Sequence, residues 1–433
     1  MALDTAGRPA PAARREGWRR PAWLEATGEW ARERLRLLDS PLATHHVLLA
    51  TTSLLVVIGL VMVLSSSSVE SLQAKGTQFY YFKRQATFAV LGAVVLVVAS
   101  RVRADRWHRL ALPALLGAAA LQALCFVPGI GIPSGGNRNW IALGPISGQP
   151  SEVAKIALVL TCALALARKR DRLHEPAQLL GALLPSVAAT IGLVLLARDL
   201  GTAMVMMFMV AAMLWTAGVP VKFFALSAAV AAVVAAGLVL TSDNRMRRVQ
   251  DWLSGGATSG VEIQGASWQP VQGKYALASG GWWGLGLGAS REKWQWLPEA
   301  HNDYIFAIIG EELGLPGTLV VLVLFAVLAL AALRLVRRSE DLFTKLAVTG
   351  FAAWLLGQAC LNIGVVLGVL PVIGVPLPFI SYGGTAVVAT LLAIGILLSF
   401  ARAEPGAPEA LKARESVVAR SLAVLPRRER RTR

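Results

Sequence analysis

One short segment of the chain holds the side chains best suited to catalysis. Residues 297–303 read Leu-Pro-Glu-Ala-His-Asn-Asp, and an apolar run then leads to the adjacent acids Glu311 and Glu312. Ionisable side chains at membrane depth are costly and usually functional. Because this chain is otherwise apolar and places its acids here, we centre a candidate site on Asp303. The alternative role for Asp303 is a helix N-terminal cap, which would stabilise the helix by roughly 1 kcal/mol.

Composition decides which class of protein must position these acids. Of 433 residues, 55% are hydrophobic and 16% are charged, and the mean hydropathy is +0.57, which leaves too little polar surface for a soluble globule. The net charge of +16, from 42 basic and 26 acidic residues, is concentrated in the tails and in alternate loops. That pattern indicates membrane orientation rather than a nucleic acid partner. The three cysteines lie in apolar runs without metal-ligand spacing, so we expect core residues and no disulfide.

Ten apolar runs are long enough to cross a hydrocarbon core, which takes roughly 20 residues each. They predict an all-α polytopic integral membrane protein with ten transmembrane helices and a large extracytoplasmic loop, 241–302, between spans 7 and 8. Residues 44–402 form this ten-span domain, between basic tails at 1–43 and 403–433. The predicted spans are 45–65, 84–101, 109–128, 150–167, 178–197, 201–217, 221–240, 315–335, 344–369 and 383–401.

The distribution of basic residues predicts the orientation. Basic residues of the connections, at 101–106, 168–172, 222 and 334–338, fall on the side of both basic tails. Positive charge marks the cytoplasmic side, so we expect both termini in the cytoplasm and the chemistry on the outer face. Residues 1–43 lack the apolar core of a secretory signal. They predict either a short amphipathic helix on the lipids of the inner leaflet or a disordered tail.

Several charged residues outside the acidic segment have two possible roles each. Glu152 and Lys155 lie three residues apart and share a helix face, so Lys155 either pairs with Glu152 or binds a substrate phosphate. Arg138 either binds a phosphate, which we favour, or anchors the chain at the interface. The arginines at 245–248 either attract an anionic lipid headgroup or form a solvated charge run. For Asp199, between two spans, we expect a helix cap.

The helix after Asp303 is too long for one crossing, because residues 303–332 would form about 45 Å of helix. We expect a break at 314–317, Gly-Leu-Pro-Gly, with 303–313 a half-helix beside a cavity. Glu311 and Glu312 should then face protein or the cavity rather than lipid. The last outer loop, 362–385, contains three prolines, and we expect it to fold inwards as one cavity wall.

Five segments of the chain resemble, in order, the signature segments of the shape, elongation, division and sporulation (SEDS) family. The likeness covers about residues 45–402, and the motifs PEAH and GEELG are closer to the division branch than to the elongation branch. Two departures concern Arg198, which stands where the family usually has proline, and Asn139, which separates Arg138 from Trp140. The five segments are QPSEVAK at 149–155, DLGTA at 199–203, SGGWWGLGLG at 279–288, LPEAHNDYIFAIIGEELG at 297–314 and LPFISYGGT at 377–385.

The resemblance implies a peptidoglycan glycosyltransferase of the bacterial cytoplasmic membrane that polymerises lipid II during cell division, at the septum. It implies a class B penicillin-binding transpeptidase and other division proteins as partners. Asp303 matches the family's essential aspartate, and we assign it as the general base that deprotonates the attacking sugar hydroxyl. The leaving pyrophosphate needs cations, for which we expect Lys155, Arg138 and Lys274 in that order, or a divalent metal such as Mg²⁺ or Mn²⁺.

Four further residues are candidates for substrate contacts: Glu152, Glu299, His301 and Ser381. For Glu299, His301, Glu311 and Glu312 the residues also leave open a metal, a partner or no ligand, and no residue is assigned to a metal. A lipid II flippase would use the same cavity and the same charges, and it is the alternative function. The two functions differ at Asp303, since a flippase should tolerate Asp303→Asn better than loss of Lys155.

Overall fold

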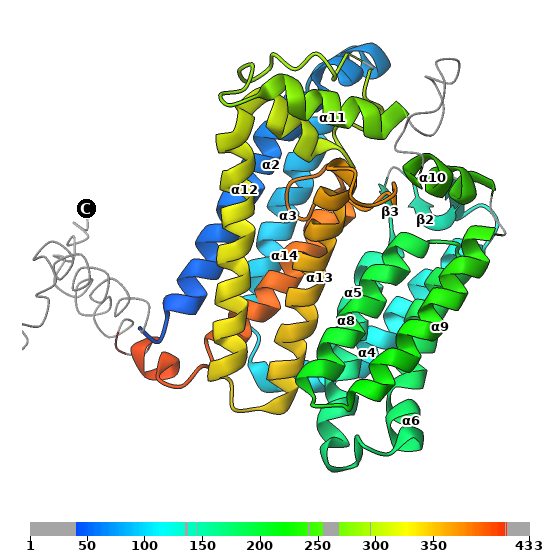
Figure 1. Cartoon of the computed structure of the whole chain (residues 1–433). Helices are drawn as coiled ribbons and strands as arrows, with labels where there is room; N and C mark the ends of the chain where they lie inside the picture. Colours follow the sequence, from blue (N-terminus) through cyan, green and yellow to red (C-terminus); the bar gives the residue numbers. More distant parts are fainter. Residues whose placement is uncertain are drawn as a thin grey trace, which may run out of the picture.

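The structure, a computed structural model, describes residues 40–134, 137–144, 146–240, 243–253, 268–294, 296–411 and 413. The amphipathic helix predicted in the N-terminal tail lies outside these residues. Long helices run between two ends of the molecule (Figure 1). These helices, with the short α7, are α2 (Ala43–Lys75), α3 (Tyr80–Arg101), α4 (Ala104–Ala123), α5 (Pro150–Arg168), α6 (Pro176–Val187), α7 (Leu193–Leu196), α8 (Leu200–Thr216), α9 (Val221–Leu240), α12 (Ile305–Arg338), α13 (Leu342–Val366) and α14 (Gly384–Ala401).

One end of the bundle, the loop end, carries two further helices and a small sheet (Figure 1). α10 (Asp243–Leu253) and α11 (Trp268–Gly280) lie there, between α9 and α12. A small antiparallel sheet of β1 (Gly131–Ser134), β2 (Asn137–Leu143) and β3 (Ile146–Gly148) lies between α4 and α5. The sequence did not predict this sheet, because its strands are too short for a clear alternating pattern.

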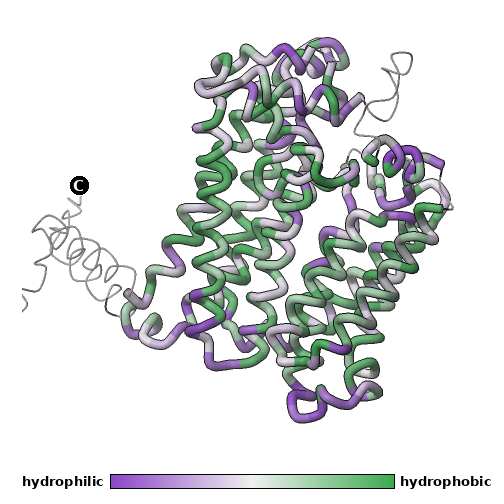
Figure 2. Tube along the Cα trace, viewed as in Figure 1, coloured by the Kyte–Doolittle hydropathy of each residue, from purple (hydrophilic) through white to green (hydrophobic). Residues whose placement is uncertain are grey.

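The predicted fold class, a polytopic helical membrane protein, is confirmed. Among the described residues, eight helices are long and apolar enough to cross a membrane, by length and composition. α8 is apolar but has only 17 residues, and α9, which has 20 residues, is not among these eight helices. The number of ten spans therefore stays a prediction. Apolar residues follow the helix shafts, and hydrophilic residues gather at the two ends (Figure 2).

The opposite end of the bundle, the tail end, holds both ends of the described chain. The Arg334 guanidinium donates a hydrogen bond to the Ser40 carbonyl, and Gly406 packs against Pro41. Both described ends on one side agree with an even number of crossings. Which side of the membrane they face stays a prediction from the positive charges of the connections.

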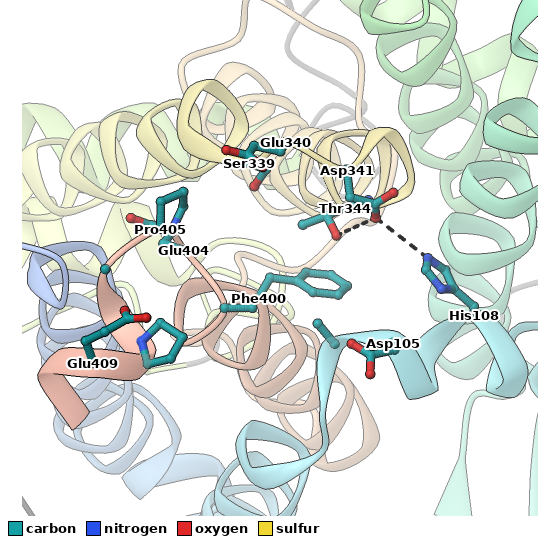
Figure 3. A pocket seen from close by; sticks show the side chains of 14 residues that line it. Asp105, His108, Ser339, Glu340, Asp341, Thr344, Phe400, Glu404, Pro405 and Glu409 are labelled. Atoms are coloured by element: carbon teal, nitrogen blue, oxygen red, sulfur yellow. Dashed lines mark hydrogen bonds and ion pairs between the residues drawn. The ribbon is translucent and has the colours of Figure 1, made fainter. Parts of the chain in front are cut away.

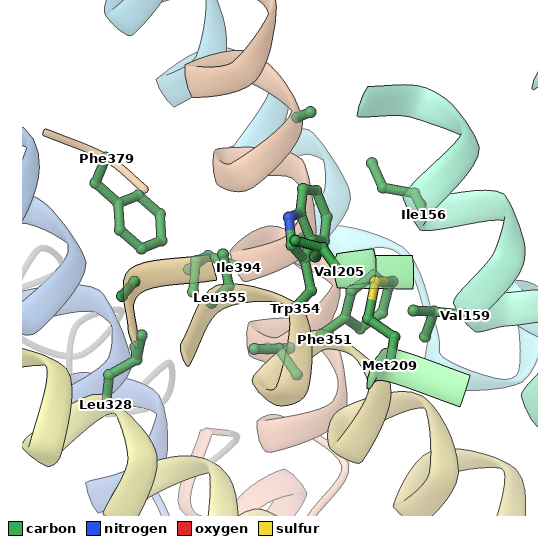
Figure 4. Close-up of a cluster of buried hydrophobic side chains, with 14 of the residues drawn as sticks. Ile156, Val159, Val205, Met209, Leu328, Phe351, Trp354, Leu355, Phe379 and Ile394 are labelled. Atoms are coloured by element: carbon green, nitrogen blue, oxygen red, sulfur yellow. The ribbon is translucent and has the colours of Figure 1, made fainter. Parts of the chain in front are cut away.

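The helices are joined by a core of interlocking apolar side chains. α5 is buried over most of its length and packs against α4, α8 and α13. Figure 4 shows Ile156 and Val159 of α5 facing Met209 of α8 and Phe351 and Trp354 of α13. Trp354 and Phe351 are fully buried, so α13 connects the helices at either side of it.

The predicted break in α12 is confirmed, and the structure explains how it is stabilised. Gly314 adopts φ 65°, a left-handed conformation that suits glycine, and Pro316 has no N–H to donate. The carbonyls that the break leaves free, those of Glu311 and Glu312, accept from the backbone N–H groups of Leu285 and Gly286 at 2.9 Å each. The glycine-rich loop after α11 therefore serves as the hydrogen-bonding partner of the broken helix.

Candidate functional site

A cavity of about 1150 Å³ lies at the loop end, in the described part of the chain. Its wall comes from β2, the α7–α8 turn, α10, the segment before α12, and the loop between α13 and α14. That loop contributes residues 370–374, Pro376 and 382–383, so the prediction that it folds inwards as a cavity wall is confirmed. Pro371 and Pro376 keep this backbone out of a regular helix.

Asp303 lines this cavity, immediately before α12. Asp303 does not take the alternative role of a helix cap: Tyr304 is the N-cap residue of α12, and no side chain caps the helix there. Among the residues that the structure describes, none donates a hydrogen bond to the Asp303 carboxylate. Burial raises the pKa of Asp303 to about 6, with a further increase from Glu299 and an opposing effect of Arg248. The carboxylate is therefore ionised at neutral pH and close to the pKa suited to a general base.

The backbone that carries Asp303 is held by three consecutive carbonyl contacts. The His301 carbonyl accepts from the Tyr382 N–H at 2.9 Å, and the Asn302 carbonyl accepts from the Ser381 hydroxyl at 2.6 Å. The Asp303 carbonyl accepts from the Asn362 amide at 2.8 Å. Donors from α13 and the following loop thus fix the main chain while the Asp303 side chain stays open to the cavity.

Four arginines supply positive charge to the cavity wall: Arg84, Arg198, Arg245 and Arg248. The Arg84 guanidinium donates to the Ser147 hydroxyl at 2.8 Å, and that of Arg248 donates to the Val372 carbonyl at 3.4 Å. A guanidinium presents five donors in a planar fork, which suits phosphate oxygens. The cavity can therefore accept an anionic group beside the Asp303 carboxylate.

The sequence left these arginines without a firm role, although one signal was available. Arg245 and Arg248 lie three residues apart, so they share a face of α10, and both line the cavity. Arg247 is exposed, as a solvated charge run predicts. Arg198 could not be placed from the sequence, because its position depends on a turn with φ 62°, an unusual conformation for a residue other than glycine.

Asp199 connects three elements of the cavity wall. The prediction that it caps a helix is confirmed, since its carboxylate accepts from the Thr202 N–H of α8 at 3.1 Å. The same carboxylate accepts from the Asn139 amide of β2 at 2.7 Å and from the Gln149 amide, just before α5, at 3.0 Å. Asp199 therefore joins β2 to the starts of α5 and α8, and its negative charge has donors on several sides.

Lys155 does not line the cavity, and neither does Glu152. The Lys155 ammonium pairs with the Glu152 carboxylate at 2.8 Å and donates to the Gln358 side chain at 3.1 Å. It also lies 4.4 Å from the centre of the Trp354 ring, and its side chain is 2% exposed. Of the two roles that the sequence allowed, the geometry matches the internal ion pair and gives no contact of either residue with the cavity.

Of the other predicted site residues, only Glu299 lines the cavity with Asp303. Arg138 is exposed on β2, where it alternates with the cavity-lining Asn137 and Asn139. Lys274 lies on α11, against Gly368. His301 and Ser381 are buried behind the wall, and their contacts hold the segment that carries Asp303.

Glu311 and Glu312 are buried by protein, as predicted, with 0% and 1% of their surfaces exposed. The Glu311 carboxylate accepts from the Ser290 hydroxyl at 2.6 Å and from the Arg291 N–H at 2.7 Å. The Ser65 hydroxyl donates to the Glu312 carboxylate and lies 2.6 and 2.7 Å from its two oxygens, and the Lys293 ammonium lies 3.6 Å from the same carboxylate. Both acids therefore attach the loop 281–297 to α12 and do not face the cavity.

A second cavity, of about 450 Å³, lies at the tail end and differs in charge (Figure 3). Among the described residues of its wall, His108 is the only basic one, and it lies 3.7 Å from Asp341. Such a wall repels phosphate, so this cavity is no candidate for an anionic substrate. The acids that line it are Asp105, Glu340, Asp341, Glu404 and Glu409.

The fold and the larger cavity define a polytopic membrane protein with an arginine-lined polar site at one end of its helices. A model of the cell cycle protein family of FtsW, RodA and SpoVE matches residues 45–405. The chain belongs to this family, which confirms the resemblance to SEDS proteins.

Individual relatives agree with this assignment. The chain is 39% identical over 386 residues to the probable peptidoglycan glycosyltransferase FtsW of Mycobacterium tuberculosis, covering 88% of this chain and 73% of that protein. It matches a chain in a solved structure of a peptidoglycan synthase complex that coordinates polymerisation and crosslinking. The TM-score is 0.66, the identity is 27%, and the match covers 82% of this chain and 96% of that chain. It also matches RodA of Thermus thermophilus, with a TM-score of 0.61, 25% identity and coverage of 82% and 96%.

Proposed function

We propose that this protein is a peptidoglycan glycosyltransferase that polymerises lipid II during bacterial cell division. The observation that carries the proposal is the Asp303 carboxylate, which opens into a cavity lined by four arginines. The names of the relatives support the same activity, since they include a probable peptidoglycan glycosyltransferase and a chain of a peptidoglycan synthase complex.

In the proposed reaction, Asp303 removes the proton of an acceptor sugar hydroxyl. The hydroxyl oxygen forms a bond to the anomeric carbon of the donor, and the bond from that carbon to the pyrophosphate oxygen breaks. Polyprenyl pyrophosphate leaves with the electron pair, and the proton stays on Asp303 until it passes to water. A pKa of about 6 leaves Asp303 largely ionised at pH 7 and therefore able to accept this proton.

The arginines of the wall take up the charge of the leaving pyrophosphate. Arg198, Arg245 and Arg248 come from the α7–α8 turn and from α10, on one side of the cavity. We assign to them the role that the sequence suggested for Lys155, Arg138 and Lys274, because those three do not line the cavity. Glu299, beside Asp303 in the wall, is the remaining predicted substrate contact there.

A divalent cation such as Mg²⁺ or Mn²⁺ would further neutralise the leaving group. The described residues contain no group of three or more His, Cys, Asp or Glu side chains arranged to hold a metal. Such an ion would therefore need phosphate oxygens of the substrate as ligands, with Asp303 or Glu299 beside them. A class B penicillin-binding transpeptidase is the proposed partner, in a cytoplasmic membrane with both termini inside and at the division septum.

The test is glycan polymerisation from lipid II by the purified protein with its partner transpeptidase. We expect polymer from the wild type and a loss of roughly 10²–10⁴-fold for Asp303→Asn, with the melting temperature retained. Equal polymer from both proteins would remove Asp303 from the mechanism. Transport of lipid II across vesicles without polymer, from a folded and partnered wild type, would favour the flippase.

A further inference from the structure

We propose that Glu70, on α2, is a positioning residue for glycosyl transfer and acts through His301. The proposal rests on the function given above and concerns how the enzyme holds its general base. Glu70 lies outside the cavity wall and outside every segment that the sequence singled out. Its position depends on α2, which extends to Lys75, ten residues beyond the predicted span.

Glu70 uses both carboxylate oxygens on groups near the candidate site. The Oε2 atom lies 3.2 Å from the Nδ1 atom of His301, and the Oε1 atom accepts a hydrogen bond from the Tyr81 hydroxyl at 3.3 Å. His301 stands two residues before Asp303 in the chain, and its side chain is 5% exposed. Among the described residues, the buried Nδ1 atom has no partner with hydrogen-bond geometry, and the Glu70 carboxylate at 3.2 Å is the ion-pair partner of the protonated imidazole.

Two tyrosine rings pack against the histidine and restrict its orientation. The ring centres of Tyr81 and His301 are 4.8 Å apart, those of His301 and Tyr382 are 5.3 Å apart, and those of the two tyrosines are 5.1 Å apart. Tyr81 and Tyr382 also line the cavity. With the Glu70 carboxylate beside Nδ1 and both tyrosine rings packed against it, the imidazole has little freedom to rotate.

The cluster formed by Tyr81, His301 and Tyr382 is joined to the backbone that carries Asp303. Tyr382 donates its N–H to the His301 carbonyl at 2.9 Å. The neighbouring loop is tied to α3, since the Gln85 amide donates to the Ser381 carbonyl at 3.1 Å and its oxygen accepts from the Gly383 N–H at 3.2 Å. Glu70 and Gln85 thus connect α2 and α3 to the two segments that meet behind Asp303.

Glu70 is suited to positioning rather than to holding the fold together. Its side chain is 45% exposed, and ion pairs with exposed partners contribute about 0–1 kcal/mol to stability. A reacting group displaced by about 1 Å can lower the rate about 10²-fold. Loss of the Glu70 contact should therefore alter catalysis much more than stability.

The test compares four variants in lipid II polymerisation by the protein with its partner transpeptidase, with kcat and KM measured separately. For Glu70→Gln and for His301→Gln we expect kcat to fall roughly 10–100-fold and KM to change less than about threefold. The melting temperature should shift by less than about 4 °C. The double variant should lose no more than either single variant, because both act through one contact. The control is Glu340→Gln, an exposed acid at the tail end, which should leave kcat unchanged.

A milder change covers the case in which Glu70→Gln does not fold. Tyr81→Phe keeps the ring and removes only the hydroxyl contact to Glu70, and we expect a fall in kcat of a few-fold at constant melting temperature. Wild-type kcat in Glu70→Gln, or in Tyr81→Phe where Glu70→Gln is unfolded, would overturn the proposal. So would losses that multiply in the double variant.

The outcome separates this inference from the function on which it rests. If Asp303→Asn abolishes polymer while a folded Glu70→Gln keeps full kcat, only the positioning role fails. If Asp303→Asn polymerises as well as the wild type, the proposed mechanism fails instead.

Discussion

Two groups of acids lie within ten residues of each other in the sequence, and the structure places them in opposite environments. Glu311 and Glu312 are buried and accept hydrogen bonds from serine hydroxyls and a backbone N–H, with the Lys293 ammonium nearby. The Asp303 carboxylate opens into the arginine-lined cavity and receives no hydrogen bond from the described residues. Burial raises its pKa to about 6.

This contrast distinguishes acids that stabilise the fold from an acid that is available to substrate. A buried carboxylate whose oxygens are satisfied by fixed donors stabilises the fold, and its loss leaves those donors unpaired. A carboxylate that faces a cavity and has a perturbed pKa is available for substrate. Removing acids of the first kind should therefore cost stability, whereas removing Asp303 should cost activity.

The largest effect expected from this comparison is on the free energy of unfolding, when the contact between the loop 281–297 and α12 is broken. In Glu312→Ala the Lys293 ammonium, whose side chain is 6% exposed, loses its carboxylate. Breaking a buried pair costs about 3–5 kcal/mol, and thermal unfolding of the protein in detergent would measure it. Asp303→Asn is the matched control and should unfold at or above the wild-type temperature. A larger loss for Asp303→Asn than for Glu312→Ala would reverse the comparison.

A smaller effect is expected where the same loop meets the broken helix. Gly284 and Gly288 both adopt positive φ, 77° and 81°, so alanine is strained at either position. A Cβ at Gly284 would meet the Glu312 backbone, whereas one at Gly288 would meet no atom within 4 Å. Gly284→Ala should therefore be less stable than Gly288→Ala by about 1–3 kcal/mol, measured by thermal unfolding. Equal losses would show that close packing of the loop on α12 contributes nothing.

The smallest expected effect is the pH dependence of the reaction, and it tests the assignment of Asp303 as the base most directly. Because the ionised carboxylate is the base, we expect kcat/KM to fall about tenfold per pH unit below about pH 6 and to be level above it. The raised pKa also affects the stability of the fold, because the folded protein binds the Asp303 proton more tightly than the unfolded chain does. The resulting stabilisation of the folded state is present below about pH 4 and is lost as the pH rises through about 6. Asp303→Asn should accordingly gain melting temperature relative to the wild type between pH 4 and pH 7. A rate that stays level down to pH 5 would contradict the assignment.

Much of the fold could be predicted from local sequence. Each predicted span overlaps a helix, because a long apolar run favours a helix that satisfies its own backbone hydrogen bonds. The break at Gly314 followed from the glycine and from Pro316, which acts on the residues next to it. The cap at Asp199 is equally local, since it reaches the Thr202 N–H three residues on.

The roles of individual charges were harder to predict, because they depend on residues far away in the chain. Lys155 looked like a phosphate ligand, but Gln358, 203 residues away, and Trp354 complete its buried environment. Arg138 lies next to cavity residues in sequence, and the direction in which β2 presents it depends on how the sheet packs.

The class of protein, the helices, the break in α12 and the choice of Asp303 as the residue to examine could all be derived from the sequence alone. These follow from hydropathy, backbone chemistry and short-range spacing. The packing of the folded chain was needed to show that Arg198, Arg245 and Arg248 line the cavity and that Glu311 and Glu312 hold a loop. It was also needed to show that Glu70 reaches His301 across 231 positions. Side-chain charges act through space over a few ångströms, so their partners are set by packing and not by distance along the chain.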